Sequence, residues 1–146
     1  MKKIAFLFLL TGVLIRCNIG GGTLGSFDDR LFPVKKADFL LAFDSLAERQ
    51  VPEKWKETAG SIEHTYRFFL NTCLYLKGPP EEMYFVSYDG SLKASAISIR
   101  SVFKGGRWYI KNDLDNSEIE RIEKRFDEEI IKKIEKKTGT KAERID

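Results

Sequence analysis

Two turn dipeptides between apolar runs constrain the fold of this chain more than any other feature. Asp89-Gly90 separates an apolar run at residues 83–88 from a longer one at 92–103, and Gly105-Gly106 separates the second run from residues 107–111. Asp-Gly and Gly-Gly favour two-residue hairpin turns, because these turns place both central residues at positive φ. The middle of the chain is therefore predicted to form an antiparallel meander of at least three strands.

Residues 62–76 fit two interpretations. Apolar side chains alternate along much of the segment, as on one face of a strand. A second set recurs at helical spacing: Ile62, Tyr66, Phe69, Cys73 and Leu76. The β-branched and aromatic residues of the segment favour an extended backbone. We therefore predict a strand, with a helix as the alternative, which gives a meander of three to four strands.

Helices are predicted before the meander. Residues 36–49 have the apolar spacing of an amphipathic helix. Its apolar face contains Phe39, Phe43 and Leu46. Pro52 is suited to the start of a short second helix that runs to Thr58 and is ended by Gly60.

A long closing helix is predicted from Ser117 to about Lys137. Ser117 and Glu120 fit a capping box, and Gly139 is a suitable C-cap. Glutamates gather near the start of this helix and lysines near its end, which suits the helix dipole. The apolar stripe contains Ile119, Ile122, Phe126, Ile130 and Ile134. We expect Phe126, at the centre of the stripe, to insert between this helix and the sheet.

Together these elements predict an α+β fold with N-terminal helices, an antiparallel meander and a long C-terminal helix. The order resembles the cystatin-like folds, in which a curved sheet wraps a helix, and the hairpin at residues 103–110 is similar to their final strand pair. The resemblance covers roughly half of the chain, and the closing helix is not required by it. It implies a ligand position inside the curved sheet, where Tyr84, Tyr88, Trp108 and Tyr109 would lie; core packing is the favoured interpretation of these four residues.

The beginning of the chain has the layout of a secretory signal. Lys2 and Lys3 precede an apolar run at residues 4–15, which is too short to cross a bilayer but fits the hydrophobic region of a signal peptide. At Leu14-Ile15-Arg16-Cys17 the chain resembles a bacterial lipoprotein signal, although that family prefers a small residue where Arg16 stands. The resemblance implies that residues 1–16 are removed and that Cys17 is lipidated, with palmitate or a related acyl chain. The alternatives are a signal peptide cut elsewhere and a buried N-terminal helix.

Residues 17–26 are predicted to be a tether between this anchor and a single domain at residues 27–146. The tether contains four glycines. Gly-rich segments behave as coils that span about 5–6 Å × √n, which gives about 15–18 Å here. The domain is therefore expected to stay close to the membrane.

Loss of the leader changes the charge balance. The whole chain has 25 Lys and Arg against 22 Asp and Glu, but Lys2, Lys3 and Arg16 precede Cys17, so the mature chain has 22 of each. A chain without net positive charge lacks the electrostatic footprint of a nucleic-acid-binding protein and has no general attraction to anionic lipid. Membrane attachment is therefore expected through Cys17.

The sequence predicts no catalytic residue, cofactor site or metal site. His64 and Cys73 are nine residues apart, which places them on opposite faces of a strand or a helix, so a Cys–His pair is not expected. Cys73 is interpreted as a small buried apolar residue. Asp113, Asp115 and Asn116 are interpreted as turn and helix-cap residues rather than as calcium ligands.

These features favour a non-enzymatic, lipid-anchored cell-envelope protein that binds a protein or a small apolar ligand, as a monomer and without a cofactor. Two alternatives stay open: a small hydrolase or isomerase with a site inside the curved sheet, and an inhibitor or immunity-type lipoprotein. A polar residue inside the sheet among apolar neighbours would favour the enzyme. An exposed apolar patch on the outer helix would favour the binding protein.

Overall fold

The structure is a computed structural model that describes residues 26–146. The predicted signal peptide, Cys17 and all of the predicted tether except Ser26 lie outside the described residues. Within the described part, helices and one antiparallel sheet form an α+β fold with a long C-terminal helical segment, which confirms the predicted fold class. None of the helices in residues 26–146 has the length and hydropathy needed to cross a bilayer.

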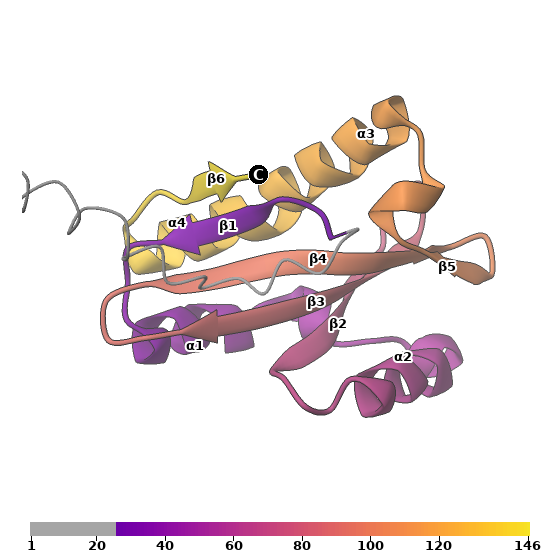
Figure 1. Ribbon diagram of the computed structural model, residues 1–146. Helices are drawn as coiled ribbons and strands as arrows, with labels where there is room; N and C mark the ends of the chain where they lie inside the picture. The colour runs from indigo at the N-terminus through magenta and orange to yellow at the C-terminus, as the bar shows by residue number, and fades with distance from the viewer. Residues whose placement is uncertain (1–25) are drawn as a thin grey trace, which may run out of the picture.

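The sheet has six strands (Figure 1). They are β1 (Asp29–Phe32), β2 (Asn71–Leu76), β3 (Glu82–Gly90), β4 (Ser95–Lys104), β5 (Arg107–Tyr109) and β6 (Glu143–Ile145). The order is β2-β3-β4-β1-β6, and β5 also pairs with β4. Strands β2 to β5 follow one another in the sequence and pair in that order, so the predicted meander is present. Strands β1 and β5 pair with opposite ends of the same edge of β4.

The helical elements lie on both faces of this sheet. They are α1 (Lys36–Asp44), the 3₁₀ turn η1 (Ala47–Arg49), α2 (Glu53–Thr65), the 3₁₀ turn η2 (Lys111–Asp113), α3 (Asn116–Phe126), the π-helical segment η3 (Asp127–Ile131) and α4 (Lys132–Thr138). Helix α1 and the continuous segment α3-η3-α4 pack on one face, which we call the inner face. Helix α2 packs on the other, outer face and covers only part of it.

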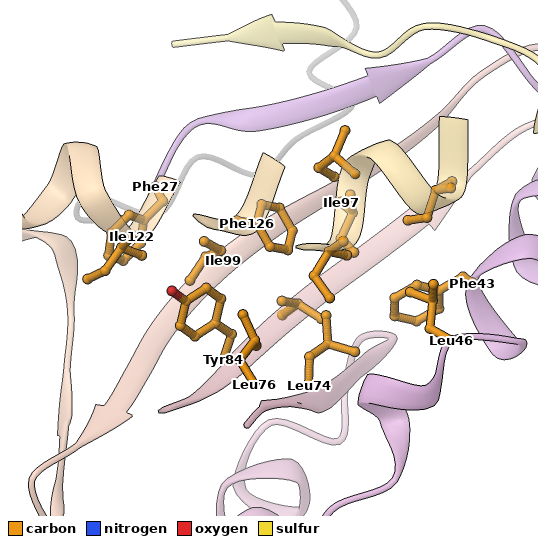
Figure 2. Close-up of a cluster of buried hydrophobic side chains, with 14 of the residues drawn as sticks. Phe27, Phe43, Leu46, Leu74, Leu76, Tyr84, Ile97, Ile99, Ile122 and Phe126 are labelled. Carbon is orange, nitrogen blue, oxygen red and sulfur yellow. The ribbon is translucent and has the colours of Figure 1, made fainter. Parts of the chain in front are cut away.

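The main core fills the space between the inner face and its helices (Figure 2). Successive side chains of a strand point to opposite faces, and Tyr84, Val86, Ile97 and Ile99 point inward toward Phe126. A smaller cluster lies under α2 on the outer face. It consists of Ala59, Cys73, Met83, Phe85 and Phe103, with Val51, Trp55, Ile62 and Trp108 against it.

The prediction of one strand through residues 62–76 is wrong for its first half. Helix α2 continues past Gly60 to Thr65, and β2 begins only at Asn71. Gly60 lies on an exposed surface within this helix, where glycine costs about 0.5–1 kcal/mol relative to alanine but does not end the helix. Trp55, Ala59 and Ile62 follow helical spacing onto the outer cluster, and this packing outweighs the strand propensity of the residues that follow.

The first predicted hairpin turn is displaced. Gly90 is still in β3, paired with Ser95, and the turn is formed by residues 91–94, where Ser91 N donates to the carbonyl of Ala94 at 2.7 Å. Glycine is needed at position 90 because neighbouring side chains lie close to it, not because of its φ angle. A Cβ there would lie 2.5 Å from Ser95 Oγ and 2.9 Å from Lys36 Cβ. The second predicted turn is confirmed: Gly105 and Gly106 have φ angles of +57° and +87°.

The closing helix is confirmed, with differences at its start and middle. Its N-cap is Asp115 rather than Ser117, since the Asp115 carboxylate accepts from Glu118 N at 2.8 Å. The π-helical segment η3 interrupts the α-helix and brings both Ile130 and Ile131 into the core. Helix α4 ends at Gly139, which is left-handed, as predicted.

The predicted helix at residues 36–49 ends earlier than expected. Helix α1 stops at Asp44, and η1 forms a separate short turn after an extended Leu46. The predicted apolar residues Phe39, Phe43 and Leu46 are nevertheless all buried in the main core. The packing of this region was therefore predicted correctly, although its helical boundary was not.

Candidate binding surface

The part of the outer face that α2 leaves uncovered has a floor of small polar residues. Ser87 on β3 and Ser98 and Ser101 on β4 occupy outward positions that alternate with the core residues of the same strands. Serine at these positions removes the apolar side chains that a second covering helix would need. The sheet is therefore apolar inside and hydroxyl-rich on this part of its outer face.

An irregularity in the pairing of β3 with β4 shapes the floor. Val86 pairs with Ile99 and Phe85 pairs with Ser101, so Arg100 is an extra residue in β4. Such β-bulges bend the strand and change the direction in which its side chains point. Arg100 Nε donates to Ser87 Oγ at 2.5 Å, and burial lowers the pKa of this guanidinium.

Ser101 supplies a polar atom that nothing else in the described part of the chain uses. The residue is 5% exposed, and its Oγ has no hydrogen-bond partner within residues 26–146. Leaving a buried hydroxyl unpaired costs about 1–3 kcal/mol. Ser101 lies in the wall of a hollow, and a bound molecule can remove this cost once the hydroxyl, which is covered in this conformation, turns toward it.

Residues 66–70, which connect α2 to β2, form a cluster of exposed apolar side chains that we call the aromatic loop. Phe68 is 87% exposed, and Tyr66, Phe69 and Leu70 are between 42% and 45% exposed. Contiguous apolar surface of this kind is unusual on monomeric soluble proteins and marks interaction sites. The loop lies at the margin of the molecule between α2 and β2 (Figure 1).

Hydrogen bonds and ring contacts fix the aromatic loop in place. Asn71 Nδ2 donates to the carbonyls of Tyr66 at 2.7 Å and Phe69 at 2.9 Å, and Tyr88 N donates to the carbonyl of Leu70 at 3.0 Å. The ring of Tyr66 lies 5.5 Å from that of Phe85 on the outer face. These contacts fix the backbone of the aromatic loop in a conformation that leaves its apolar side chains exposed.

The aromatic loop and the serine floor border a common hollow of about 1260 Å³ that is open to the surroundings. Its wall also includes the end of α2, Trp108 on β5 and Ser26, the first described residue. Small-molecule sites typically measure about 300–1,000 Å³ and combine apolar walls with a few placed polar groups. We refer to this space, bounded by the aromatic loop, Ser26, Ser87, Ser98, Ser101 and Trp108, as the hollow.

His64 and Cys73 do not form a pair. His64 is exposed on α2, whereas Cys73 is fully buried on β2 as a free thiol, as expected for a small apolar residue. The side chain facing this part of β2 is Glu63, whose Oε1 accepts from Cys73 N at 2.8 Å and from Thr72 Oγ1 at 3.2 Å. Burial raises the pKa of the Cys73 thiol, so the nucleophilic thiolate is disfavoured.

The four aromatic residues considered for a pocket inside the sheet separate into different environments. Tyr84 is fully buried in the main core, as the core interpretation predicted. Tyr88 lies partly buried against that core and borders the hollow, and Trp108 belongs to the outer cluster and the hollow. The half-exposed ring of Tyr109 is contacted by Arg107 and Lys104. The hollow therefore lies on the opposite face from the one that the cystatin-like resemblance implies.

The acidic residues near the start of α3 have the predicted turn and cap roles. Asp113 Oδ2 accepts from Ile110 N at 3.0 Å, and Asp115 caps α3. Across residues 26–146, no group of three or more His, Cys, Asp and Glu side chains is placed to hold a metal ion.

Glu82 is a polar residue among apolar neighbours on the inner face, and both of its oxygens are occupied. Oε2 accepts from Tyr84 OH at 3.0 Å, Arg125 at 2.9 Å and Arg121 at 3.2 Å, and Oε1 pairs with Arg121. Burial beside this carboxylate raises the pKa of Tyr84. The group fixes α3 on the sheet, and two arginines and a tyrosine hold the Glu82 carboxylate in place.

The serine floor and the aromatic loop are the candidate site residues that sequence reasoning missed. A signal was present for Ser87 and Ser98, which stand between apolar residues of the same strands, but not for Ser101, which follows the bulge residue Arg100. The aromatic loop had no independent signal while residues 62–76 were taken as one strand. No protein-family model matches the chain, and no curated protein or solved structure is significantly similar to it.

Proposed function

We propose that this protein is a non-enzymatic, lipid-anchored cell-envelope protein that binds a small apolar ligand in the hollow. One observation carries the binding part of this proposal: the exposed aromatic loop stands beside a floor that holds an unpaired hydroxyl, Ser101 Oγ. The lipid-anchored part rests on the sequence around Cys17.

The make-up of the hollow defines the chemistry of the ligand. Phe68, Leu70 and Trp108 offer apolar surface, and burial of apolar area contributes about 25 cal/mol per Å². Ser101 Oγ can donate or accept one hydrogen bond. Charged side chains, among them Lys36, Asp89 and Arg100, also line the hollow. The ligand is therefore an apolar molecule that carries at least one polar group.

The anchor is tested by mass spectrometry of the protein from the membrane fraction. We expect an N-terminal peptide that begins at Cys17 and carries acyl chains, because the apolar run ends there and the Gly-rich segment begins there. An unmodified peptide from the mature protein that contains both Arg16 and Cys17 would disprove lipidation.

Ligand binding is tested with the fluorescent probe 1-anilinonaphthalene-8-sulfonate, which combines an apolar body with a polar group. The protein is a chain of residues 26–146, which contains both hydrophobic clusters and all six strands, and its fold is first checked by circular dichroism. We expect saturable fluorescence, weakened about two- to tenfold by Ser101→Ala, since one neutral hydrogen bond contributes about 0.5–1.5 kcal/mol.

A matched pair of variants separates the hollow from exposed apolar residues in general. Phe68→Ser should weaken probe binding, whereas Leu41→Ser should not, because Leu41 is 75% exposed but lies on α1 at the opposite face of the sheet. Equal effects of the two substitutions, or no effect of either, would contradict a site in the hollow.

A further inference from the structure

The aromatic loop is more exposed than ligand binding in the hollow requires. Phe68 is 87% exposed although it stands on the rim, so most of its ring is turned to the surroundings rather than to the floor. The loop conformation is fixed by the Asn71 hydrogen bonds. A rigid apolar projection of this kind is suited to contact an apolar phase outside the molecule.

The described chain starts in the wall of the same hollow. Ser26 lines the hollow, Phe27 N donates to the carbonyl of Ile99 at 3.2 Å, and Ser98 Oγ donates to the carbonyl of Phe27 at 3.2 Å. Cys17 precedes Ser26 by nine residues, and a coil of this length spans about 15–18 Å. An anchor at Cys17 therefore keeps the hollow, with the aromatic loop on its rim, within reach of the bilayer.

The charge around the aromatic loop fits a position at the bilayer. Residues 64–70 contain no acidic side chain, and Arg67 holds its guanidinium 5.7 Å from the centre of the Phe68 ring. Tyrosine and tryptophan are enriched at the level of lipid headgroups, and a basic side chain is attracted to an anionic membrane surface. The combination of apolar rings and one arginine matches the interfacial layer of a bilayer.

We propose that the aromatic loop inserts into the interfacial layer of the membrane that carries the Cys17 anchor, so that the hollow opens toward the bilayer. The proposal rests on the lipid anchor of the proposed function. It adds a second contact to the anchor, and it gives an apolar ligand a route from the membrane into the hollow that avoids water.

The test places a fluorophore on the loop of the full-length lipidated protein. The thiol of Phe68→Cys is labelled with a nitrobenzoxadiazole dye; the fully buried Cys73 does not compete for the label. The protein is reconstituted into phosphatidylethanolamine–phosphatidylglycerol vesicles that contain doxyl-labelled phospholipid. We expect a blue-shifted emission and quenching several-fold stronger than for the same dye at Leu41→Cys.

Each outcome decides one step of the proposal. Strong quenching at position 68 and weak quenching at position 41 support insertion of the loop. Equal or absent quenching in protein that floats with the vesicles overturns insertion and leaves the anchor intact. Protein that does not float with the vesicles disproves the anchor, and with it the membrane orientation proposed here.

Discussion

Phe126 connects the closing helix to the sheet through a single ring. It is fully buried, and its ring centre lies 6.3 Å from that of Tyr84 on β3. Truncation of a buried phenylalanine to alanine costs about 3–5 kcal/mol, a large part of a domain stability of about 5–15 kcal/mol. We therefore expect Phe126→Ala to lower the urea midpoint of unfolding strongly.

The exposed face of the same helical segment provides the control for Phe126→Ala. Lys132 is exposed at the start of α4, and exposed substitutions usually change stability by about 0.5 kcal/mol or less. If Lys132→Ala destabilised the protein as much as Phe126→Ala, the assignment of the buried face would be wrong.

Individual buried residues were predicted well where periodicity alone determines burial. Four of the five stripe residues are fully buried, because an apolar face with this spacing must be covered, and Ile119, in the first turn, is partly buried. The sequence did not predict that Ser101 would place a buried hydroxyl in the floor of the hollow. Its position depends on the extra residue Arg100 in β4, and a bulge is set by pairing between strands.

At the scale of elements, two glycines predict opposite effects of the same substitution. Gly60→Ala should stabilise the protein by about 0.5–1 kcal/mol, because Gly60 lies within α2 with open space around it. Gly90→Ala should destabilise it by about 1–3 kcal/mol, because the new methyl group would collide with Ser95 Oγ and Lys36 Cβ. Thermal unfolding of the two variants checks the prediction, and the same sign for both would contradict it.

The same two glycines explain why the element boundaries were mispredicted. Glycine was taken as a helix stop at position 60 and as a turn residue at position 90. In the structure one glycine is simply tolerated on an exposed helix surface, and the other makes room for a neighbouring strand and helix. Sequence alone does not show whether a glycine is tolerated, is needed to make room for a neighbour, or is needed for a positive φ angle. A positive φ angle is the reason for glycine at Gly105 and Gly106.

At the scale of the whole molecule, ion pairs within α3 and between α3 and β4 make stability depend on pH. Hydrogen bonds from Arg121, and then from Lys104, lower the pKa of Glu118 to about 2, although burial opposes this. The ordinary pKa is 4.5, so between pH 4.5 and about 2 the unfolded chain binds a proton that the folded chain does not. The free energy of unfolding should therefore fall as the pH falls through this range.

Urea titrations at a series of pH values check this expectation with a neutral variant. Glu118→Gln cannot take up the proton, so its stability should be lower at pH 7 and should change less between pH 4.5 and 2. Glu120→Gln, an exposed substitution on the same helix, is the control. A wild-type slope retained in full by Glu118→Gln would contradict the role given to this ion pair.

The strands that join the two ends of the domain were the part of the fold that sequence could not predict. Strands β1 and β6 contain four and three residues, too few for a pattern of alternation. The two strands form only when the beginning of the domain pairs with β4 and with the end of the chain. Arg30 on β1 pairs with Asp127 at 2.6 Å, and Arg144 on β6 pairs with Asp28 at 2.6 Å. Their formation depends on the finished molecule rather than on local sequence.

The pairing of β1 with β6 also has a mechanical consequence. The strands are antiparallel, with Asp29 opposite Ile145, so the entry and exit of the described chain leave the sheet at the same end of this pair. A force applied between the two ends of the described chain would therefore load the ladder bonds one after another instead of all together. Strand β6 would peel away at low force and act as a weak link, so that tension on the C-terminus would be released before it reached the core.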